Sequence, residues 1–185
     1  MRVGLLGGSF NPVHNMHLFI AQKAKEQYQL DEIYLLPAYV SPHKIGQKMA
    51  SVKDRCEMLS LAIAHNADLK IEYLDVMREE PSYTYHTICQ LQEKYPENEY
   101  FFIIGGDQIA NLDQWYRIEE LKQKIQFIGV SRDQVNIPKG ILPLSIPQYE
   151  LSSSYIRQQC HEGKSIRYLV PDAVNAYIQE KELYQ

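Results

Sequence analysis

The sequence GGSFNPVHNMH occupies residues 7–17 and decides the fold that we expect. It follows a short apolar run, residues 3–6, and precedes a helical pattern that begins near Asn15. Such a strand–glycine turn–helix junction can bind phosphate, because glycine allows close backbone approach and the first N–H groups of the helix are unpaired. His14 and His17 are three residues apart, so on one helical turn both imidazoles face the same side. We therefore expect a phosphate site whose two histidines suit charge developing on phosphorus.

Other motifs fit this turn less well. A dinucleotide fingerprint needs Gly-x-Gly-x-x-Gly, whereas the glycines here are Gly4, Gly7 and Gly8. The Gly-Lys-Ser/Thr ending of a P-loop is absent, and no glutamate follows His14 as in the zinc-protease helix. Two ordinary loop histidines, or a metal site, stay open as alternatives. Two histidines at helical spacing directly after a strand and a glycine turn favour the phosphate site.

The composition indicates one soluble globular domain of 185 residues, with 45% hydrophobic and 23% charged residues. The net charge of −4 gives no global attraction for nucleic acid or an anionic membrane, so any attraction for phosphates is local. Three widely spread cysteines suit reduced thiols in a cytosolic protein. We see no leader peptide and no membrane-spanning run, and expect a cytoplasmic protein. The sequence leaves a homo-oligomer open.

Strand and helix patterns alternate along the first two thirds of the chain, which predicts an α/β fold with a parallel sheet. The expected strands are residues 3–6, 33–36, 69–76, 100–104, 125–130 and 141–146. The expected helices include residues 18–28, 52–64 and 88–95, with Ser51 as the N-cap of the second.

A second candidate anion site is LSSSYIR, residues 151–157. Serines that open a helix cap it with their hydroxyls and leave N–H groups for an anion, although such serines are often only caps. Arg157, one turn further on, can donate to two phosphate oxygens at once.

Both stretches resemble the signatures of the nucleotidyltransferase superfamily. Residues 7–17 are similar to Gly-Gly-Ser/Thr-Phe-Asp/Asn-Pro-x-His-x-Gly-His, and residues 151–157 to Ile-Ser-Ser-Thr-x-Ile-Arg, which grips the β- and γ-phosphates of ATP. The chain looks most like the bacterial nicotinate-nucleotide adenylyltransferases. Met16 departs from the pattern, since glycine stands between the histidines there, and its side chain could crowd the incoming nucleotide.

The segment SYTYHT, residues 82–87, resembles the family's Ser-Tyr-Thr-x-Asp-Thr, which presents backbone amides to the nicotinate carboxylate. From the residues alone, Thr84 is an N-cap whose helix leaves the N–H groups of Tyr85 and His86 unpaired. His86 stands where the family has an acidic residue, which leaves the role of its side chain open.

Residues 105–116 resemble the family segment Gly-x-Asp-x-x-x-x-Leu-x-x-Trp. Asp107 can accept hydrogen bonds from ribose hydroxyls, or can be only the N-cap of residues 108–112. Trp115, the sole tryptophan, is by default a packing residue. The resemblance places Trp115 against the nicotinate ring and adds the Tyr116 N–H to that of Tyr85 on the carboxylate.

Two basic residues complete the expected site. Lys44 ends the loop after residues 33–36, where loops line the ligand crevice of a parallel sheet, and Pro42-His43-Lys44 resembles a family loop that reaches the phosphates and the mononucleotide. Arg132 matches the family's arginine after residues 125–130, with Asp133 in place of a frequent proline. In family members the helix at residues 52–64 is structural, so the resemblance implies that Arg55 is a surface or ion-pairing residue.

The resemblance covers essentially the whole chain and predicts a Rossmann-like, doubly wound, mostly parallel sheet with helices on both faces. It implies a single nucleotidyltransferase domain, residues 1–185, with the helical part from about residue 152 to 185 packed on it. The implied reaction is adenylyl transfer from ATP to nicotinate mononucleotide, with Mg²⁺ carried on the ATP phosphates and no protein metal site. The implied catalytic residues are His14, His17 and Arg157. The implied ATP contacts are Gly8, Ser9, Phe10, His14, His17, Gly105, Asp107, Ser153, Ser154 and Arg157. The implied nicotinate mononucleotide contacts are Gly8, Ser9, Lys44, Thr84, Tyr85, Trp115, Tyr116 and Arg132.

Three alternatives remain at this stage. The acceptor could be nicotinamide mononucleotide, pantetheine phosphate or a cytidylyl acceptor, although the Thr84 and Trp115 segments argue against the last two. The chain could be a nucleotide-binding regulatory module that has lost its chemistry, with Met16 as the reason. An NAD-dependent oxidoreductase is disfavoured by the glycine spacing.

Overall fold

The computed structural model describes residues 1–42, 45–132, 137–147 and 150–185, except for the side chains of residues 131 and 132. Within these ranges the strands are β1 (Arg2–Gly8), β2 (Glu32–Pro37), β3 (Leu69–Ile71), β4 (Glu99–Ile104), β5 (Gln126–Arg132) and β6 (Ile141–Ile146). They form one sheet in the order β3-β2-β1-β4-β5-β6, and all neighbouring pairs are parallel. This is a doubly wound order, so the prediction of a Rossmann-like parallel sheet is confirmed.

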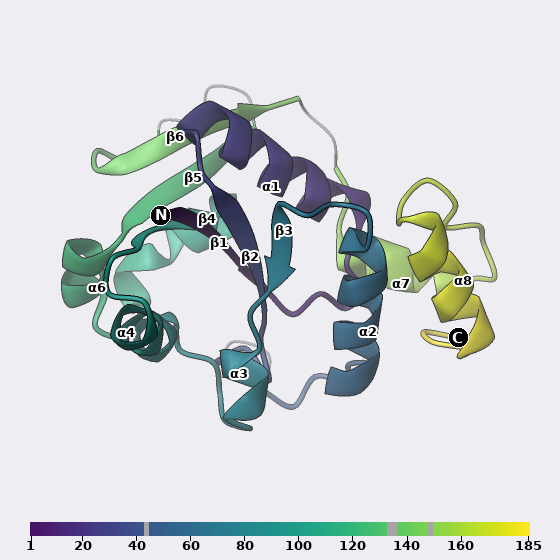
Figure 1. Ribbon diagram of the computed structural model, residues 1–185. Helices are drawn as coiled ribbons and strands as arrows, with labels where there is room; N and C mark the ends of the chain where they lie inside the picture. The colour runs from purple at the N-terminus through teal and green to yellow at the C-terminus, as the bar shows by residue number, and fades with distance from the viewer. Residues whose placement is uncertain (43–44, 133–136, 148–149) are drawn as a thin grey trace.

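Helices cover both faces of the sheet (Figure 1). They are α1 (Asn15–Tyr28), α2 (Val52–Ile63), α3 (Leu74–Met77), α4 (Thr84–Lys94), α5 (Gly106–Ala110), α6 (Ile118–Lys124), α7 (Ser153–His161) and α8 (Asp172–Glu180), with a 3-10 turn, η2 (Leu112–Gln114). One apolar cluster joins the sheet to Ala21 of α1, Met58 of α2 and Ile178 of α8. A second cluster joins the sheet to Ile88 of α4 and Leu121 of α6.

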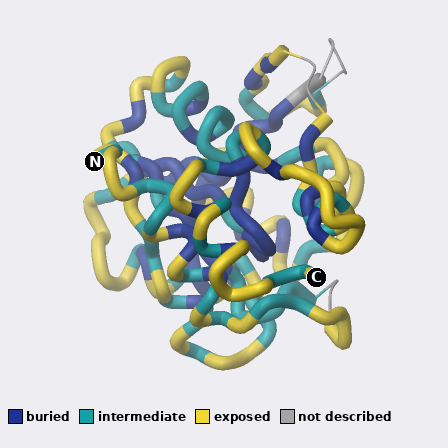
Figure 2. The backbone as a smooth tube through the Cα atoms, turned by 90° about the vertical axis from the view of Figure 1, so that its right-hand side faces the viewer, coloured by how far each residue is buried: buried dark blue, intermediate teal, exposed yellow. Residues whose placement is uncertain are grey.

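The central strand β4 divides its side chains between these two clusters. Phe101 and Ile103 belong to the first, and Tyr100, Phe102 and Ile104 to the second. This alternation follows from the two-residue repeat of a strand. Because both faces of β4 are covered, its sequence is continuously apolar after Glu99, as is usual in parallel sheets. In Figure 2 the buried backbone accordingly runs through the middle of the molecule, with exposed turns around it.

The expected strand at residues 69–76 is wrong in its second half. β3 ends at Ile71, and the helix α3 begins at Leu74. β3 is an edge strand that pairs only with β2, and Asp75 turns inward to a buried hydrogen bond with Thr87 and an ion pair with Arg78 (2.6 Å). The alternating pattern of residues 69–76 therefore belongs to two short elements.

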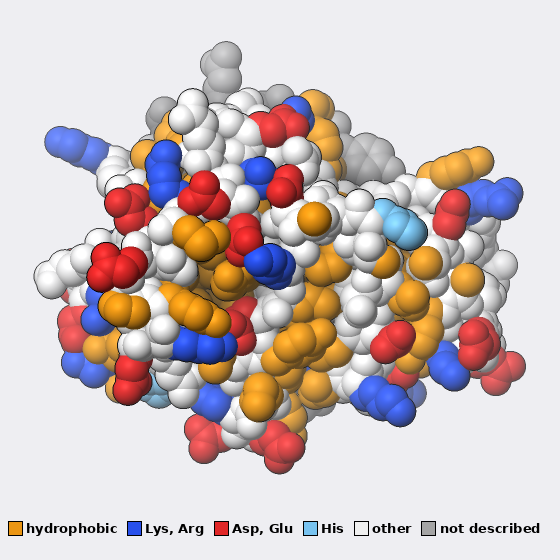
Figure 3. Space-filling model, in the orientation of Figure 1, with side chains coloured by type: hydrophobic (Ala, Val, Ile, Leu, Met, Phe, Trp, Pro, Cys, Tyr) orange, Lys and Arg blue, Asp and Glu red, His pale blue; other side chains and the backbone are white. Residues whose placement is uncertain are grey.

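Acidic and basic side chains are interspersed over the face drawn in Figure 3. None of the helices in the described ranges is both long enough and apolar enough to cross a bilayer. Cys56, Cys89 and Cys160 are all free thiols.

Candidate active site

The glycine turn lies where the direction of strand order reverses. β1 sits between β2 and β4, and all three are parallel, so their carboxyl ends meet at one edge of the sheet. The chain moves outward from β1 to β2 and β3, then returns to β4 on the other side of β1. In doubly wound folds this switch point opens the crevice that binds ligands.

His14 and His17 lie together at the start of α1, as the sequence predicts. Their rings stack with centroids 3.6 Å apart and planes at 19°. His17 Nδ1 accepts a hydrogen bond from the His14 backbone N–H (3.2 Å), so the side chain of His17 caps its own helix. An accepting Nδ1 carries no proton, and the neutral His17 ring therefore holds its proton on Nε2, where it can donate.

His14 is buried, with 4% of its surface exposed. Its Nδ1 has no hydrogen-bond partner among the residues that the structure describes. Burial lowers the pKa of His14 to about 4, because the charged imidazolium is poorly solvated there. At pH 7 the ring is neutral and offers one N–H donor and one acceptor.

Met16, which replaces the motif glycine, is a buried residue of α1. It is 8% exposed and belongs to the same apolar cluster as Ala21 and Val170. This packing into the core argues against the expectation that the side chain crowds an incoming nucleotide, which stays a prediction.

The serine-led helix α7 lies directly against the turn between β1 and α1, residues 9–14, which we call the first turn. Ser153 Oγ donates to the Pro12 carbonyl oxygen (2.8 Å), and Arg157 Nη1 donates to the Asn11 carbonyl oxygen (2.8 Å). A second N–H of Arg157, on Nη2, bonds Ser154 Oγ (3.1 Å). Ser152 caps α7 by accepting from the Tyr155 N–H (3.2 Å). Two helix starts that are distant in sequence thus converge on one place.

Aromatic side chains gather at the start of α4. The rings of Tyr85 and Tyr116 are 5.9 Å apart, and Tyr116 also lies 5.5 Å from Tyr83 and 5.4 Å from His86. The N–H groups of His86 and Thr87 bond the Tyr83 carbonyl oxygen, so the expectation of an unpaired His86 N–H is wrong. Among the described residues, the N–H groups of Thr84 and Tyr85 are left as the open donors of this helix start. The N-cap is Tyr83, so the expectation of Thr84 as the N-cap is wrong by one residue.

Trp115 and Asp107 lie on the segment that follows β4. Trp115 is half-buried and packs edge-to-face on Phe102 (5.8 Å) and Phe127 (6.1 Å), which matches its default interpretation as a packing residue. Asp107 is exposed inside the first turn of α5. The N-cap of that helix is Gly105, whose N–H bonds Gln108 Oε1 (2.9 Å), so the alternative of Asp107 as an N-cap is wrong.

Arg55 is the largest departure from the sequence-based expectation. It was expected at the surface or in an ion pair, but it is 1% exposed and bonds three backbone carbonyl oxygens. A signal existed in the sequence. Arg55, Met58 and Leu59 share the spacing of one helical face, and the two apolar residues are fully buried.

Sequence comparison decides the family. The cytidylyltransferase-like family matches residues 5–159. A Bacillus subtilis nicotinate-nucleotide adenylyltransferase is 41% identical to this chain over 186 residues, which cover 100% of this chain and 98% of the relative. An Enterococcus faecalis protein named "Probable nicotinate-nucleotide adenylyltransferase" is 45% identical over 188 residues, covering 100% of this chain and 85% of that protein. The chain belongs to the nicotinate-nucleotide adenylyltransferase family.

A structural comparison supports the same fold for this adenylyltransferase family member. The structure titled "Plasmodium falciparum nicotinic acid mononucleotide adenylyltransferase complexed with NaAD" superposes with a TM-score of 0.82 at 20% identity. The superposition covers 99% of this chain and 97% of the other. The family and the enzyme class predicted from the sequence are thus confirmed, whereas the roles of individual residues stay predictions.

The side chains of two basic residues in the family loops are not described by the structure. Lys44, with His43 beside it, lies outside the described residues. Arg132 ends β5, and only its backbone is described. Their expected contacts with nicotinate mononucleotide remain predictions.

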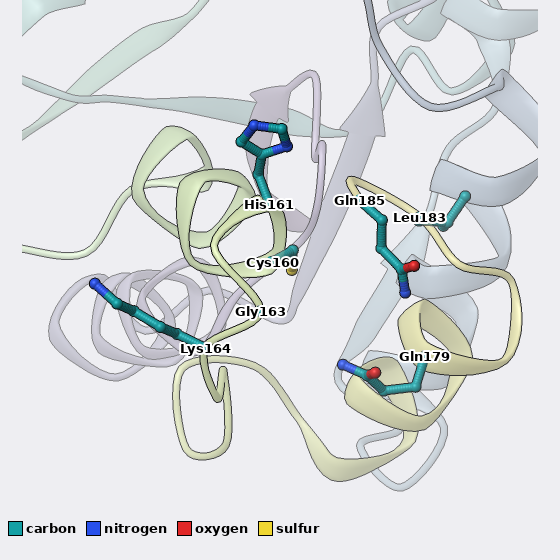
Figure 4. A pocket seen from close by; sticks show the side chains of 7 residues that line it. All are labelled: Cys160, His161, Gly163, Lys164, Gln179, Leu183 and Gln185. Atoms are coloured by element: carbon teal, nitrogen blue, oxygen red, sulfur yellow. The ribbon is translucent and has the colours of Figure 1, made fainter.

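A cavity of about 330 Å³ lies between α7 and the C-terminal segment. It is lined by Cys160, His161, Gly163, Lys164, Gln179, Leu183 and Gln185 (Figure 4). Lys164 extends away from Gln179 and Gln185 in that view and is ion-paired with Glu162 (2.6 Å). This cavity includes none of the residues that the adenylyltransferase motifs bring together.

Proposed function

We propose that this chain transfers the adenylyl group of ATP to nicotinate mononucleotide, forming nicotinate adenine dinucleotide (deamido-NAD) and pyrophosphate. The observation that carries the proposal is the pair of hydrogen bonds from Ser153 and Arg157 to the Pro12 and Asn11 carbonyl oxygens. These bonds hold two anion-binding helix starts side by side, as one triphosphate requires. Family membership at 41–45% identity supports the same activity.

The reaction is a direct in-line displacement on the α-phosphorus of ATP. A 5′-phosphate oxygen of the mononucleotide forms the new O–P bond while the bond from the α-phosphorus to the bridging oxygen breaks, and that oxygen leaves with pyrophosphate. The attacking oxygen is already anionic, so no general base is needed. Catalysis then consists of positioning and charge stabilisation.

The first turn supplies donors for the α-phosphate. His17 can donate from Nε2, because its Nδ1 is occupied by the His14 N–H. The amides of Ser9 and Phe10 add backbone donors that require no reorganisation during the reaction, whereas the Gly8 amide belongs to the ladder of β1 with β2. Neutral His14 lies stacked on His17 and completes the imidazole pair.

We assign the binding of the leaving pyrophosphate to α7. Arg157 gives two of its five N–H groups to described residues, Asn11 and Ser154, and within the described part of the chain the other three are available for phosphate oxygens. Ser153 and Ser154 add N–H groups of a helix start, which have no partner among the described residues. Gly105 and Asp107, at the carboxyl end of β4, are assigned to the ATP ribose.

The nicotinate carboxylate is assigned to the backbone N–H groups of Tyr85 and Tyr116, with Thr84 beside them and the Trp115 ring against the pyridine. N–H donors favour a carboxylate over a carboxamide, because the amide's NH₂ group would face them without an acceptor. The juxtaposition of the Tyr85 and Tyr116 rings, 5.9 Å apart, supports this assignment.

Mg²⁺ is assigned to the ATP phosphates as part of the substrate. In the described part of the chain, no group of three or more His, Cys, Asp or Glu side chains is placed to hold a metal ion. Mg²⁺ prefers oxygen ligands and is commonly bound through substrate phosphates. We also infer a cytoplasmic location, which free thiols suit.

The test is a pyrophosphate-release assay with ATP held constant and nicotinate or nicotinamide mononucleotide as the acceptor. We expect turnover with nicotinate mononucleotide to exceed that with the amide, and CTP to replace ATP poorly. His17→Asn keeps an acceptor for the His14 N–H and removes the imidazole donor, so kcat should fall by about 10²–10³-fold with the fold retained by circular dichroism. Near-full turnover of a folded His17→Asn protein would remove His17 from the mechanism, and no pyrophosphate release by the natural protein would overturn the proposed function.

A further inference from the structure

Arg55 of α2 carries a positive charge into the interior without a carboxylate partner. Its residue exposure is 1%, and no Asp or Glu oxygen among the described residues lies within 4.0 Å of its nitrogens. The titratable groups that act on it are Cys56 and Tyr184, which are neutral at pH 7. Buried charges are normally paired, so an unpaired buried guanidinium calls for a specific use.

The guanidinium is held by backbone carbonyl oxygens alone. Nη1 donates to the oxygens of Ser9 and Ala38, both at 2.7 Å, and Nη2 donates to the oxygen of Tyr39 at 3.0 Å. Ser9 follows β1, and Ala38 and Tyr39 follow β2. One side chain therefore ties together the two loops that leave neighbouring strands at the ligand edge of the sheet.

The bond to Ser9 fixes the direction of a neighbouring donor. The Ser9–Phe10 peptide is trans, so its C=O and the Phe10 N–H point in opposite directions. With the carbonyl turned to Arg55, the N–H points away from α2. No described residue accepts a hydrogen bond from this N–H. A charged donor on the carbonyl also polarises the peptide, which makes its N–H a stronger donor.

The backbone at Phe10 needs such support. Its φ is +46°, in the left-handed region that non-glycine residues seldom adopt. A conformation of this kind persists only where the surroundings impose it, and it is often found at functional sites. Burial of the Phe10 side chain, 1% exposed, and the Arg55 bond to the preceding carbonyl both restrain it.

The bonds from Arg55 to Ala38 and Tyr39 connect it indirectly to the segment that leads to α4. The Ala38 N–H bonds the Gly8 carbonyl oxygen (2.9 Å), and the Tyr39 N–H bonds Ser82 Oγ (3.0 Å). The Ser82 N–H in turn bonds the Val40 carbonyl oxygen (2.9 Å). This short chain of bonds links the first turn to the residues directly before the start of α4.

We propose that Arg55 is a positioning residue for adenylyl transfer, which turns the Phe10 N–H toward the substrate phosphates and holds the first turn in register with the loop after β2. The proposal rests on the proposed function. Arg55 touches neither substrate. It acts through the Ser9–Phe10 peptide, and its uncompensated charge adds to the attraction of the first turn for phosphate.

The experiment compares Arg55→Met and Arg55→Lys with a control from the same helix. Arg55→Met removes the charge and the donors at similar length, and Arg55→Lys keeps the charge but loses the fork that bonds three carbonyl oxygens. Leu59→Ala is the control, because Leu59 is fully buried on the same face of α2 and its truncation destabilises the helix packing without touching the turn. Each protein is assayed for pyrophosphate release at a temperature where circular dichroism shows it folded.

We expect kcat to fall about 10²-fold in Arg55→Met and less in Arg55→Lys, with Leu59→Ala within about twofold of the natural protein. A second readout is the ¹⁵N chemical shift of the Phe10 amide, followed during titration with a non-hydrolysable ATP analogue. This shift should respond to the analogue in the natural protein and lose that response in Arg55→Lys.

The proposal is overturned if kcat falls in the Arg55 variants no further than in Leu59→Ala, or if the Phe10 amide responds to the analogue equally in all proteins. If Arg55→Met does not fold, Arg55→Lys and the amide titration decide the question. The proposed function fails separately, when the natural protein itself releases no pyrophosphate. In that case the amide titration still tests the orientation of the Phe10 N–H.

Discussion

At the scale of single residues, the buried His14 makes stability depend on pH. Its pKa is about 4 in the folded protein and about 6.5 when it is exposed, so between these values the unfolded chain binds more protons. The stabilising contribution is complete above pH 6.5 and is lost as the pH falls toward 4. Since one pKa unit corresponds to about 1.4 kcal/mol, the loss approaches about 3 kcal/mol.

His14→Gln tests this prediction, because glutamine does not titrate. Urea unfolding between pH 4.5 and 7.5 should show a steeper loss of stability on acidification in the natural protein than in the variant. Parallel curves would mean that His14 has the same pKa in both states. The comparison with the variant cancels the titration of the other groups.

Residue roles could be predicted only where a motif or a periodic pattern exposed them. The spacing of His14 and His17 after a glycine turn indicates a shared site. Arg55 shares a helical face with Met58 and Leu59, but a charged side chain on such a face suggests solvent until the carbonyl oxygens that receive it are known. Those oxygens belong to Ser9, Ala38 and Tyr39, and no periodicity of the sequence places them together.

At the scale of elements, the first turn of α1 shows how the chain replaces the motif glycine. Met16 is 8% exposed in the apolar cluster, so Met16→Gly removes a buried side chain and adds a flexible residue to a helix. We expect the free energy of unfolding to fall by about 3 kcal/mol. The KM for ATP should stay within about twofold.

Met77→Gly is the matched control for this prediction. Met77 is also helical, in α3, but is 77% exposed, so its replacement should cost only about 1 kcal/mol. Urea unfolding measures both variants. A lower KM for ATP in Met16→Gly would show that the methionine obstructs the nucleotide after all.

Most elements were predictable because their periodicity is long and clear. β4 and β6 match their expected ranges closely, and Ser51 caps α2 through the Asp54 N–H (3.0 Å), as expected. The wrong predictions concern short strands and helices. β3 and α3 together span only residues 69–77, where the buried ion pair of Asp75 and Arg78 overrides the local pattern.

At the scale of the whole molecule, the site is assembled from opposite ends of the chain. Arg157 of α7 donates to the Asn11 carbonyl oxygen of the first turn. The hydroxyl of the C-terminal Tyr184 donates to Asn11 Oδ1 of the same turn (2.9 Å). The paired motifs predicted that α7 and the first turn share one ATP, but not the hydrogen bond from Arg157 to the Asn11 carbonyl oxygen. The sequence could not predict the Tyr184 contact, since a tyrosine near the end of a helical segment carries no sign of its partner.

Tyr184 and Tyr177 give a matched test of this long-range support. Tyr184 bonds Asn11 Oδ1, which also accepts the Ala50 N–H (3.0 Å), whereas the Tyr177 hydroxyl bonds Asp54 Oδ1 (2.9 Å) on α2. Replacing either tyrosine by phenylalanine removes one hydrogen bond, so each variant should lose about 1 kcal/mol of stability. Only Tyr184→Phe loosens the turn to which we assign phosphate binding, so only this variant should lower kcat/KM for ATP, by several-fold. Urea unfolding and pyrophosphate release measure the two effects separately, and equal kcat/KM values in the two variants would show that the C-terminal segment stabilises the fold without shaping the site.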